Sequence, residues 1–400
     1  MKKVSIVGVG LGLSTITREA EEAIAQAEVL IGARRTLEIV SGLVAGVPKR
    51  LYSHYLPKDI SDAIAAENAE RFAVLVSGDI GFYSAATKLA DALSMYDLHF
   101  VPGISTVNAF FARLKLPWQD AAFVSAHGHE TDIVGIIRRN RLTFCLTGNN
   151  INALGTALCE AGFGRVTTHI VENLGTDTER VYETTADELA HAKFQSMTVL
   201  LFVNEAFDDR TPFGLPDSRF SRLSGIPMTK GETRAVVMSK LDLRPASICW
   251  DIGAGTGSVT VEMALSAYRG HVYAVERRTE AIPLIKQNCM SFHIGNVTAI
   301  CGEAPVALEP LPAPNAVCTG GSGGLLDEII SSVLRKNPDA RIVVTAVTLE
   351  TVSSALTIFS KAGLSPEIAQ LNVARSKRAG ELHLMEAQNP VTILSAGGKP

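Results

Sequence analysis

The sequence predicts two α/β domains in one chain, and three observations support this fold class. The 400 residues are too many for one ordinary core and suit two domains of about 200 residues. Short apolar runs alternate with helical patterns in both halves, which is typical of largely parallel sheets covered by helices. Residues 206–225 are polar, contain Pro and Gly, and lack hydrophobic periodicity, so we expect domains at 1–205 and 226–400 joined by this linker.

The composition favours a soluble globular protein, with 46% hydrophobic and 20% charged residues. The net charge of −4 gives no reason to expect a nucleic-acid partner. No uninterrupted run of about 18 apolar residues predicts a membrane span. The six cysteines are scattered without a Cys-x-x-Cys pair, so we expect no metal and a reducing, cytoplasmic location.

The second half is organised around residues 247–258, a short apolar run that ends on Asp251 and turns through three glycines. A helical pattern follows at once, so the motif reads as strand, glycine turn and helix start. The glycines are spaced Gly-x-Gly-x-Gly, and Ser258 stands where a dinucleotide fingerprint needs its third glycine. The next apolar run ends on Glu276, and an acid at this distance can accept both hydroxyls of a ribose.

This arrangement resembles motifs I and II of class I methyltransferases, which bind S-adenosylmethionine (SAM). The resemblance implies a Rossmann-like, seven-strand sheet with the cofactor at its glycine turn, and it places a polar group after the strand at 297–301 near the adenine. The expected cofactor-binding residues are Thr229, Asp251, Gly253, Ala254, Gly255, Thr256, Gly257, Glu276, Glu303 and Ala304.

The first half opens with a strand and glycine turn at residues 4–12. A Gly-Asp loop follows at 77–83, and a Pro-Gly-Ile-Ser helix start lies at 102–106. In this order, and with the segments at 125–129 and 146–150, they resemble the tetrapyrrole (class III) methylase family. Ile80 stands where that family has a proline.

The tetrapyrrole methylase resemblance implies a two-lobed domain with SAM folded between its lobes. Backbone groups hold most of the cofactor in this family, which suits a loop with glycines and a helix N-terminus. The expected cofactor-binding residues are Gly78, Asp79, Gly81, Ser105 and Thr106. The first glycine turn is expected to face the tetrapyrrole through Gly8, Gly10 and Gly12.

His127 and His129 are spaced so that they could bind a metal. Beside them the sequence offers only Glu130 as a further ligand, so we favour a polar loop near the substrate and expect no metal.

Four further segments of the second half resemble the C15-methylating, decarboxylating enzymes of cobalamin biosynthesis. They lie at residues 227–234, 302–305, 320–324 and 371–375. The first half resembles the C5-methylating partners of these enzymes, so the chain resembles a family in which the two are fused. The implied activity is methylation of precorrin-6B at C5 and C15 with decarboxylation of the C12 acetate, giving precorrin-8X, with one SAM per domain.

The substrate of that family carries many carboxylates, so cationic side chains and a pliable glycine loop are expected to orient it. The expected residues are Lys230, Arg234, Gly320, Gly321 and Arg375. For Lys230 and Arg234, spacing alone equally fits a solvated helix start with Thr229 as N-cap and Glu232 in a capping box. No catalytic residue can be named, because an electron-rich ring carbon attacks the methyl group directly.

Two other functions remain open on the sequence. A nicotinamide-linked oxidoreductase with two Rossmann domains is disfavoured, because both glycine runs miss the third fingerprint position. A SAM-binding regulator without enzyme activity would show the same cofactor motifs. We expect a homo-oligomer in either case.

Overall fold

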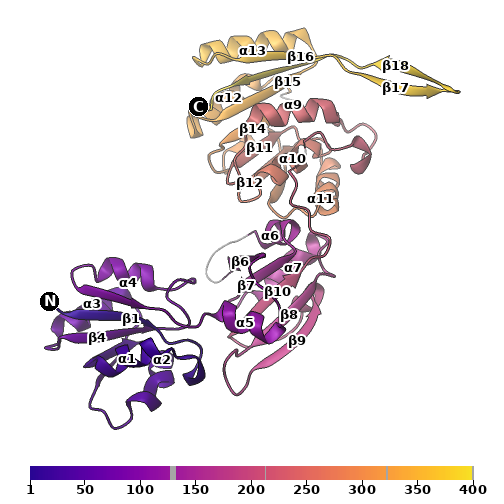
Figure 1. The fold of residues 1–400 in the computed structure, drawn as a ribbon. Coiled ribbons are helices and arrows are strands. Elements are labelled where there is room, and N and C mark those ends of the chain that lie inside the picture. The colour runs from indigo at the N-terminus through magenta and orange to yellow at the C-terminus, as the bar shows by residue number, and fades with distance from the viewer. Residues whose placement is uncertain (127–131, 212, 321–322, 399–400) are drawn as a thin grey trace.

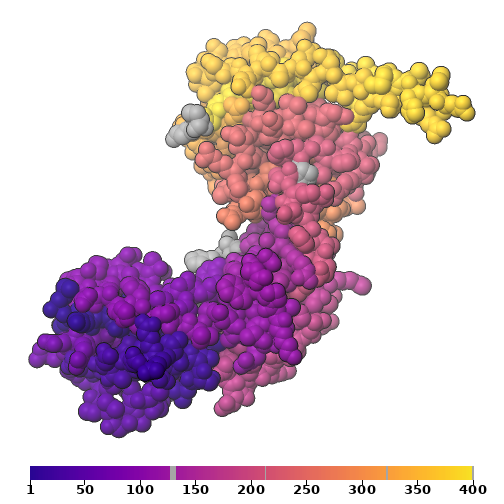
Figure 2. Space-filling view, viewed as in Figure 1, coloured from indigo at the N-terminus to yellow at the C-terminus, as the bar shows by residue number. Residues whose placement is uncertain are grey.

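The structure, a computed structural model, describes residues 1–126, 132–211, 213–320 and 323–398. In these ranges the chain forms three sheets with their helices and a separate two-stranded hairpin (Figure 1). The body around the second sheet lies between the other two bodies (Figures 1 and 2). Among the described residues, no helix is both long and apolar enough to cross a membrane.

The first sheet is parallel, with the strand order β3-β2-β4-β1-β5. Its central strands are buried on both faces, so they read as continuous apolar runs in the sequence. The strands are β1 (Lys3–Gly8), β2 (Val29–Gly32), β3 (Arg50–Ser53), β4 (Arg71–Val76) and β5 (Asp97–Val101). The helices are α1 (Arg18–Gln26), α2 (Arg34–Val40), α3 (Pro57–Ala66) and α4 (Ala86–Ala92).

The second sheet is mixed, with the order β6-β7-β10-β8-β9; β6 and β7 run parallel and the other pairs antiparallel. Its strands are β6 (Ala121–Ser125), β7 (Leu142–Leu146), β8 (Thr167–Glu172), β9 (Arg180–Thr185) and β10 (Thr198–Val203). Its helices are α5 (Thr106–Leu114), α6 (Ile133–Arg139), α7 (Ile151–Glu160) and α8 (Ala186–Leu189). Phe110 of α5 packs edge-on against Phe144 of β7, so the helix that follows β5 belongs to the second core.

The third sheet has the order β13-β12-β11-β14-β15-β19-β16, in which β19 runs antiparallel to its neighbours β15 and β16. Its strands are β11 (Ile248–Ile252), β12 (His271–Glu276), β13 (Val297–Cys301), β14 (Ala316–Thr319), β15 (Arg341–Ala346), β16 (Glu367–Leu371) and β19 (Val391–Ala396). Helices α9 (Gly231–Leu241), α10 (Ser258–Ser266) and α11 (Ala281–Ser291) cover one face, and α12 (Leu326–Lys336) and α13 (Leu349–Lys361) cover the other. The predicted α/β fold class is confirmed.

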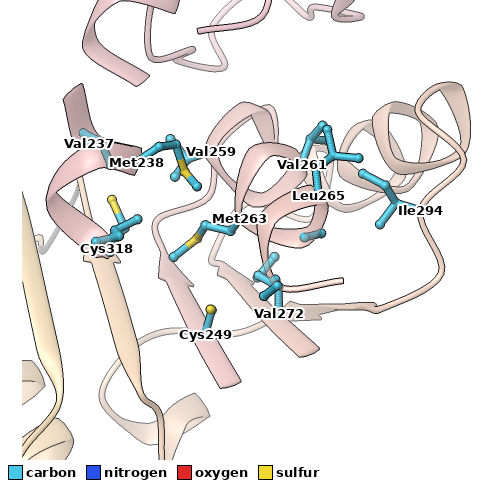
Figure 3. Close-up of a cluster of buried hydrophobic side chains, with 14 of the residues drawn as sticks. Val237, Met238, Cys249, Val259, Val261, Met263, Leu265, Val272, Ile294 and Cys318 are labelled. Atoms are coloured by element: carbon cyan, nitrogen blue, oxygen red, sulfur yellow. The ribbon is translucent and has the colours of Figure 1, made fainter. Parts of the chain in front are cut away.

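Figure 3 shows the core under the first of these faces. Val261 and Leu265 of α10 pack towards Val272 of β12, and Met238 of α9 belongs to the same buried cluster. Cys249 of the central strand β11 is buried in this cluster as a free thiol. This packing fixes α10, and with it the glycine turn from which α10 starts.

A hairpin that the sequence did not predict projects from the third body (Figures 1 and 2). It is formed by β17 (Ala374–Ala379) and β18 (Leu382–Ala387), which pair only with each other among the described strands. Leu382, Leu384 and Met385 are exposed on it, so the hairpin has no core of its own.

The expected linker is ordered in its second part. Leu215 and Phe220 are buried in the core of the third body. The amide of Gly214 donates to Glu262 Oε2 over 2.8 Å, and the amide of Ser221 donates to Asn288 Oδ1 over 2.8 Å. Residues 214–221 therefore pack as part of the second half, which a stretch without periodicity could not reveal.

The second and third bodies meet at the amino edge of the third sheet. His293, just before β13, stacks on Phe163 with ring centroids 4.4 Å apart, and its Nδ1 lies 2.9 Å from the Ala161 oxygen. Tyr268, just before β12, lies under the Arg139 guanidinium, which is 4.1 Å from the ring centroid. The carboxyl ends of the same strands are at the opposite edge of the sheet.

Candidate functional site

A cavity of about 800 Å³ lies at the carboxyl ends of the parallel strands of the third sheet. Open α/β sheets bind their ligands at this edge, where the connections to the helices leave a crevice. Residues that the sequence predicted for the site and that line this cavity are Thr229, Lys230, Gly253, Ala254, Gly255, Glu276, Glu303, Ala304 and Gly320.

The glycine turn after β11 forms one wall of the cavity. Gly255 has φ +56°, and a Cβ there would lie 2.6 Å from the Pro227 oxygen, so the position accepts only glycine without a shift of the backbone. Thr256 is buried, and its carbonyl oxygen accepts from Asn288 Nδ2 over 2.8 Å. A Cβ on Gly257 would contact Ile285 of α11. Thr256 and Gly257 therefore hold the turn against α11 and do not line the cavity.

Glu276 lies at the end of β12 with 7% of its surface exposed. One carboxylate oxygen accepts from the Gly255 amide over 2.9 Å, and the other accepts from the Arg278 amide over 3.0 Å. Each oxygen of a carboxylate has a second lone pair. Glu276 can therefore brace the glycine turn and still accept two hydroxyl groups from a ligand in the cavity.

Asp251 lies beneath the turn and does not line the cavity. It is buried, and its Oδ2 accepts from Thr260 Oγ1 over 2.5 Å. Burial raises the pKa of this carboxyl to about 6, although the bond from Thr260 opposes the shift. Asp251 thus ties β11 to α10 and positions the turn from below.

Arg234 was expected at the substrate, but it is fully buried in a network of carboxylates and carbonyls. Its Nε donates to Glu262 Oε1 over 2.7 Å, and its Nη1 donates to Asp217 Oδ1 over 3.0 Å. It also donates to the Thr229 and Leu215 carbonyl oxygens, and its guanidinium lies over the Phe220 ring, 4.6 Å from the centroid. With its donors used in this way, Arg234 holds residues 215–217 to α9 and α10.

Arg375 also lies outside the cavity, at the base of the hairpin. Its Nη1 donates to Asp217 Oδ2 over 2.8 Å, and its Nε donates to Glu232 Oε1 over 3.0 Å. The bonds from Glu232 and Asp217 raise the pKa of the guanidinium. This double ion pair gives Arg375 protein partners where the sequence suggested a substrate carboxylate.

Lys230 differs from these two arginines, because it lines the cavity. It occupies the N-cap position of α9, which begins at Gly231, and its side chain makes no capping bond. Thr229, which we considered as the N-cap, precedes this position and lines the cavity instead.

Gly323, from the expected glycine loop at 320–324, also lines the cavity. The remaining walls include residues that the sequence did not single out, among them Arg277, Arg278, Val347, Gln388 and Asn389. Because Arg277 and Arg278 follow Glu276 directly, their position at the end of the same strand could have been predicted from the sequence. Gln388 and Asn389 had no such signal, because only the unpredicted hairpin brings the chain back to this edge. Gly321 lies outside the described residues, as do His127 and His129.

In the first half, three of the predicted loops meet at the carboxyl ends of the adjacent strands β4, β1 and β5. The Gly10 and Gly78 amides each donate to the other residue's carbonyl oxygen, over 3.1 and 2.8 Å. Asp79 Oδ1 accepts from the Gly103 amide over 3.1 Å, and Oδ2 accepts from the Gly81 amide over 2.8 Å. Asp79 therefore holds two of these loops together.

The other predicted residues of the first half surround these loops. Ser105 is the N-cap of α5, and its Oγ accepts from the Asn108 amide over 3.2 Å. Thr106 begins that helix, 4.0 Å from the place of a Cβ on Gly78. A Cβ on Gly12 would lie 3.1 Å from the Gly175 oxygen, after β8 of the second sheet. The first glycine turn thus reaches the junction of the two lobes, and Gly8 packs against Gly103 there.

The third body is a class I methyltransferase domain by its fold, and it carries a glycine turn and an acid at the ends of adjacent strands. Comparison with known proteins agrees with this class and extends it to the first half. Residues 3–190 match the family model of tetrapyrrole (corrin/porphyrin) methylases, and residues 223–397 match the precorrin methyltransferase domain.

Named relatives cover the whole chain or one of its halves. The precorrin-6Y C(5,15)-methyltransferase [decarboxylating] of a Sinorhizobium species is 29% identical over 401 residues, which cover 97% of this chain and 95% of the relative. A probable cobalt-precorrin-6B C(15)-methyltransferase (decarboxylating) of Pyrobaculum calidifontis is 41% identical over 185 residues, 46% of this chain and 95% of the relative. The crystal structure of precorrin-6Y C5,15-methyltransferase from Geobacter metallireducens is 39% identical, covers 46% of this chain and 97% of its own, and has a TM-score of 0.44.

The chain belongs to the precorrin-6Y C5,15-methyltransferase (decarboxylating) family. This confirms the family to which the sequence motifs pointed. The chain is accordingly an enzyme of the SAM-dependent methyltransferases, with SAM as its methyl donor.

Proposed function

We propose that this chain methylates precorrin-6B at C5 and C15 and decarboxylates its C12 acetate side chain, giving precorrin-8X in cobalamin biosynthesis. The first half, residues 1–205, performs the C5 methylation. The second half performs the C15 methylation and the decarboxylation, and we place its start near residue 213 in view of the packing of residues 214–221. The observation that carries the proposal is one chain with both methylase domains, similar along 97% of its length to a C(5,15)-methyltransferase.

Each half binds one SAM in this proposal. The cavity of the second half suits the cofactor, because each Glu276 carboxylate oxygen keeps a lone pair that can accept a ribose hydroxyl, and Gly255 has no side chain to obstruct the turn. Glu303 and Ala304, which line the far side, are near the adenine. In the first half, Gly78, Asp79, Gly81, Ser105 and Thr106 form the corresponding site at the meeting loops.

Bound SAM supplies a methyl group on a sulfonium, which a nucleophilic ring carbon displaces in line. The chain contributes positioning, which is the main catalytic term for such a transfer. Glu276 and the glycine turn fix one end of the donor, while Gly320 and Gly323 let the acceptor approach from the opposite wall. Leu371 and Val391 line the cavity as partly buried apolar side chains and limit the access of water to it. Loss of carbon dioxide needs an electron sink, which the conjugated ring supplies.

Lys230 is the residue of the predicted cationic set that we assign to a substrate carboxylate. It lines the cavity, whereas Arg234 and Arg375 are held by Glu262, Asp217 and Glu232. In the first half, Gly8, Gly10 and Gly12 contribute backbone to the tetrapyrrole side of the lobe junction.

The function is tested by mass spectrometry of precorrin-6B incubated with the full chain and SAM. The expected product has gained two methyl groups and lost one carbon dioxide. Titration calorimetry with SAM should give two sites per chain. A product with neither change, from substrate that a verified relative converts, would refute the proposed activity.

We also propose a homo-oligomer in which the β17–β18 hairpin contacts a second copy of the chain. An isolated two-stranded hairpin is marginally stable in water, and this one exposes Leu384 and Met385. Lys377 and Glu386 pair 3.2 Å apart on it, so a two-fold arrangement of two hairpins could exchange these charges. Light scattering should give a multiple of the 42.6 kDa chain mass, and Leu384→Glu should reduce it to that mass.

A further inference from the structure

Arg277 is an exposed arginine on the wall of the cavity that no motif had singled out. It follows Glu276 at the end of β12, while its Nη1 comes within 3.6 Å of the place where a Cβ on Gly323 would be. Strand β11 lies between β12 and β14, so the Arg277 side chain extends across the end of β11 towards the loop after β14. Two strand spacings are about 10 Å. The guanidinium therefore lies above the glycine turn, on the solvent side of the cavity.

The guanidinium of Arg277 has no hydrogen bond or ion pair to any residue that the structure describes. Three other arginines of the second half differ: Arg234 and Arg375 are held by carboxylates, and Arg341 donates to the Lys240 and Gly397 carbonyl oxygens. Even Arg278, the neighbour on the same wall, donates to the Gly225 carbonyl oxygen.

We propose that Arg277 orients the tetrapyrrole in the second half by binding one of its peripheral carboxylates with the planar fork of the guanidinium. This rests on the proposed function, which supplies a substrate with several carboxylates. The guanidinium geometry matches a carboxylate through two parallel hydrogen bonds. Lys230, on the α9 side of the turn, gives a second cation for another carboxylate, so the two charges define the rotation of the ring over the methyl donor.

The surroundings of Arg277 suit the rest of such a ligand. Val306, Val347 and Leu349 are strongly exposed apolar side chains that follow β13 and β15, at the same edge of the sheet. Val306 begins a short 3-10 helix, Val347 lies between β15 and α13, and Leu349 begins α13. A ring with an apolar body and carboxylates on its rim would cover these side chains and reach Arg277 at once. Such a ligand would remove these exposed apolar side chains from water.

The test compares Arg277→Gln and Arg277→Lys with Arg244→Gln in steady-state assays of C15 methylation by the full chain. Arg244 is the matched control, because it is exposed at the amino edge of the sheet and has no side-chain partner among the described residues. Loss of a charge-assisted bidentate contact should raise the KM for the tetrapyrrole at least about ten-fold in Arg277→Gln. Arg277→Lys should raise this KM less than Arg277→Gln does, but it should not restore the wild-type value, because an ammonium group cannot form the two parallel hydrogen bonds of a guanidinium. Arg244→Gln should leave the KM unchanged.

Two further measurements separate this role from a cofactor contact. The Kd for SAM should stay within about two-fold of wild type, and the dependence of kcat/KM on salt concentration should become shallower in Arg277→Gln alone. An unchanged KM, or a SAM Kd that rises as much as the KM, would overturn the assignment. If wild type itself does not turn over, the proposed function fails instead.

Discussion

The glycines at three strand ends of the first half and the glycines of the loop after β14 in the second half have opposite surroundings. In the first half, Gly8, Gly78 and Gly103 come from three strand ends and pack backbone against backbone. A Cβ on Gly103 would lie 2.2 Å from the Gly78 oxygen and 2.7 Å from the Gly8 oxygen. In the second half, among the residues that the structure describes, Arg277 Nη1 alone comes within 4 Å of a Cβ on Gly323, at 3.6 Å, and no atom comes within 4 Å of a Cβ on Gly324.

A glycine-rich loop therefore has two physical uses that look alike in sequence. The first use brings separate strand ends together and leaves the ligand to the surface that they form jointly. The second use leaves room beside a single loop for a ligand to occupy. Three changes test this difference between the halves. They are a cut between the halves, substitution of a packed glycine of the first half, and removal of one cofactor contact of the second half.

The largest effect on stability is expected from the position at which the chain is cut between its two halves. A fragment 223–400, cut at the start of the family match, lacks Asp217 and the Leu215 carbonyl that hold the buried Arg234. Arg234 keeps Glu262 in this fragment, but removing one partner of a buried ion pair typically costs about 3–5 kcal/mol. The fragment should therefore unfold at much lower urea concentration than fragment 210–400. Equal unfolding midpoints would show that residues 214–221 are only a linker, as the sequence suggested.

The next largest effect is expected when a packed glycine of the first half is substituted. Gly103→Ala forces a methyl group against two backbone oxygens, which should lower the free energy of unfolding of this half by about 3 kcal/mol. C5 methylation should be lost while C15 methylation continues. The control is Gly42→Ala, where the nearest atom to the new Cβ is Leu13 Cδ1 at 3.7 Å. If the two variants have the same melting temperature, the contact of Gly103 with the two backbone oxygens is not the reason why this position needs a glycine.

The third effect concerns SAM in the second half only. Glu276→Ala removes the carboxylate that we assign to the ribose, and loss of two charge-assisted bonds should cost roughly 2–4 kcal/mol of binding. Calorimetry should then find one of the two SAM sites weakened and the other unchanged. Unaltered C15 methylation at limiting SAM would contradict the ribose assignment.

The sequence was sufficient for the fold class and for the cavity wall formed by the glycine turn and Glu276. Both depend on local order along the chain, because a strand, a turn and an acid at a strand end are set by neighbouring residues. Periodicity also located β13, at Val297–Cys301, where the structure has it.

The sequence was insufficient where a side chain's partner is distant along the chain. Arg375 pairs with Glu232, 143 residues away, and Arg234 pairs with Glu262 from another helix. A basic residue near a site reads the same whether a carboxylate of the protein or of a substrate faces it. The hairpin was missed for a related reason, since its strands are exposed and lack the alternation that marks a strand on a core.

A smaller effect is the contribution of Asp251 to the pH dependence of stability without SAM. Its pKa is about 6 in the folded chain against an ordinary value of 3.8, so the folded state holds the proton more tightly. Its contribution to stability is therefore present below about pH 4 and is lost as the pH rises to about 6, by at most about 3 kcal/mol. Relative to wild type, Asp251→Asn should gain stability in urea unfolding across this window. Asp327→Asn, at an exposed position of α12, should show no such gain.

The last prediction is that joining the halves in one chain gives no kinetic advantage. The second and third bodies touch at the amino edge of the third sheet, through His293 and Tyr268, whereas the cavity lies at its carboxyl edge. The strands of five to six residues between these edges span about 17–20 Å, and the second body separates them further from the loops at Gly103. The singly methylated intermediate should thus leave one site and reach the other through solution.

Separately purified Gly103→Ala and Glu276→Ala chains, mixed at matched concentrations of working sites, should form the doubly methylated product as fast as wild type. Accumulation of the intermediate in the mixture, but not with wild type, would show that the halves pass it on directly.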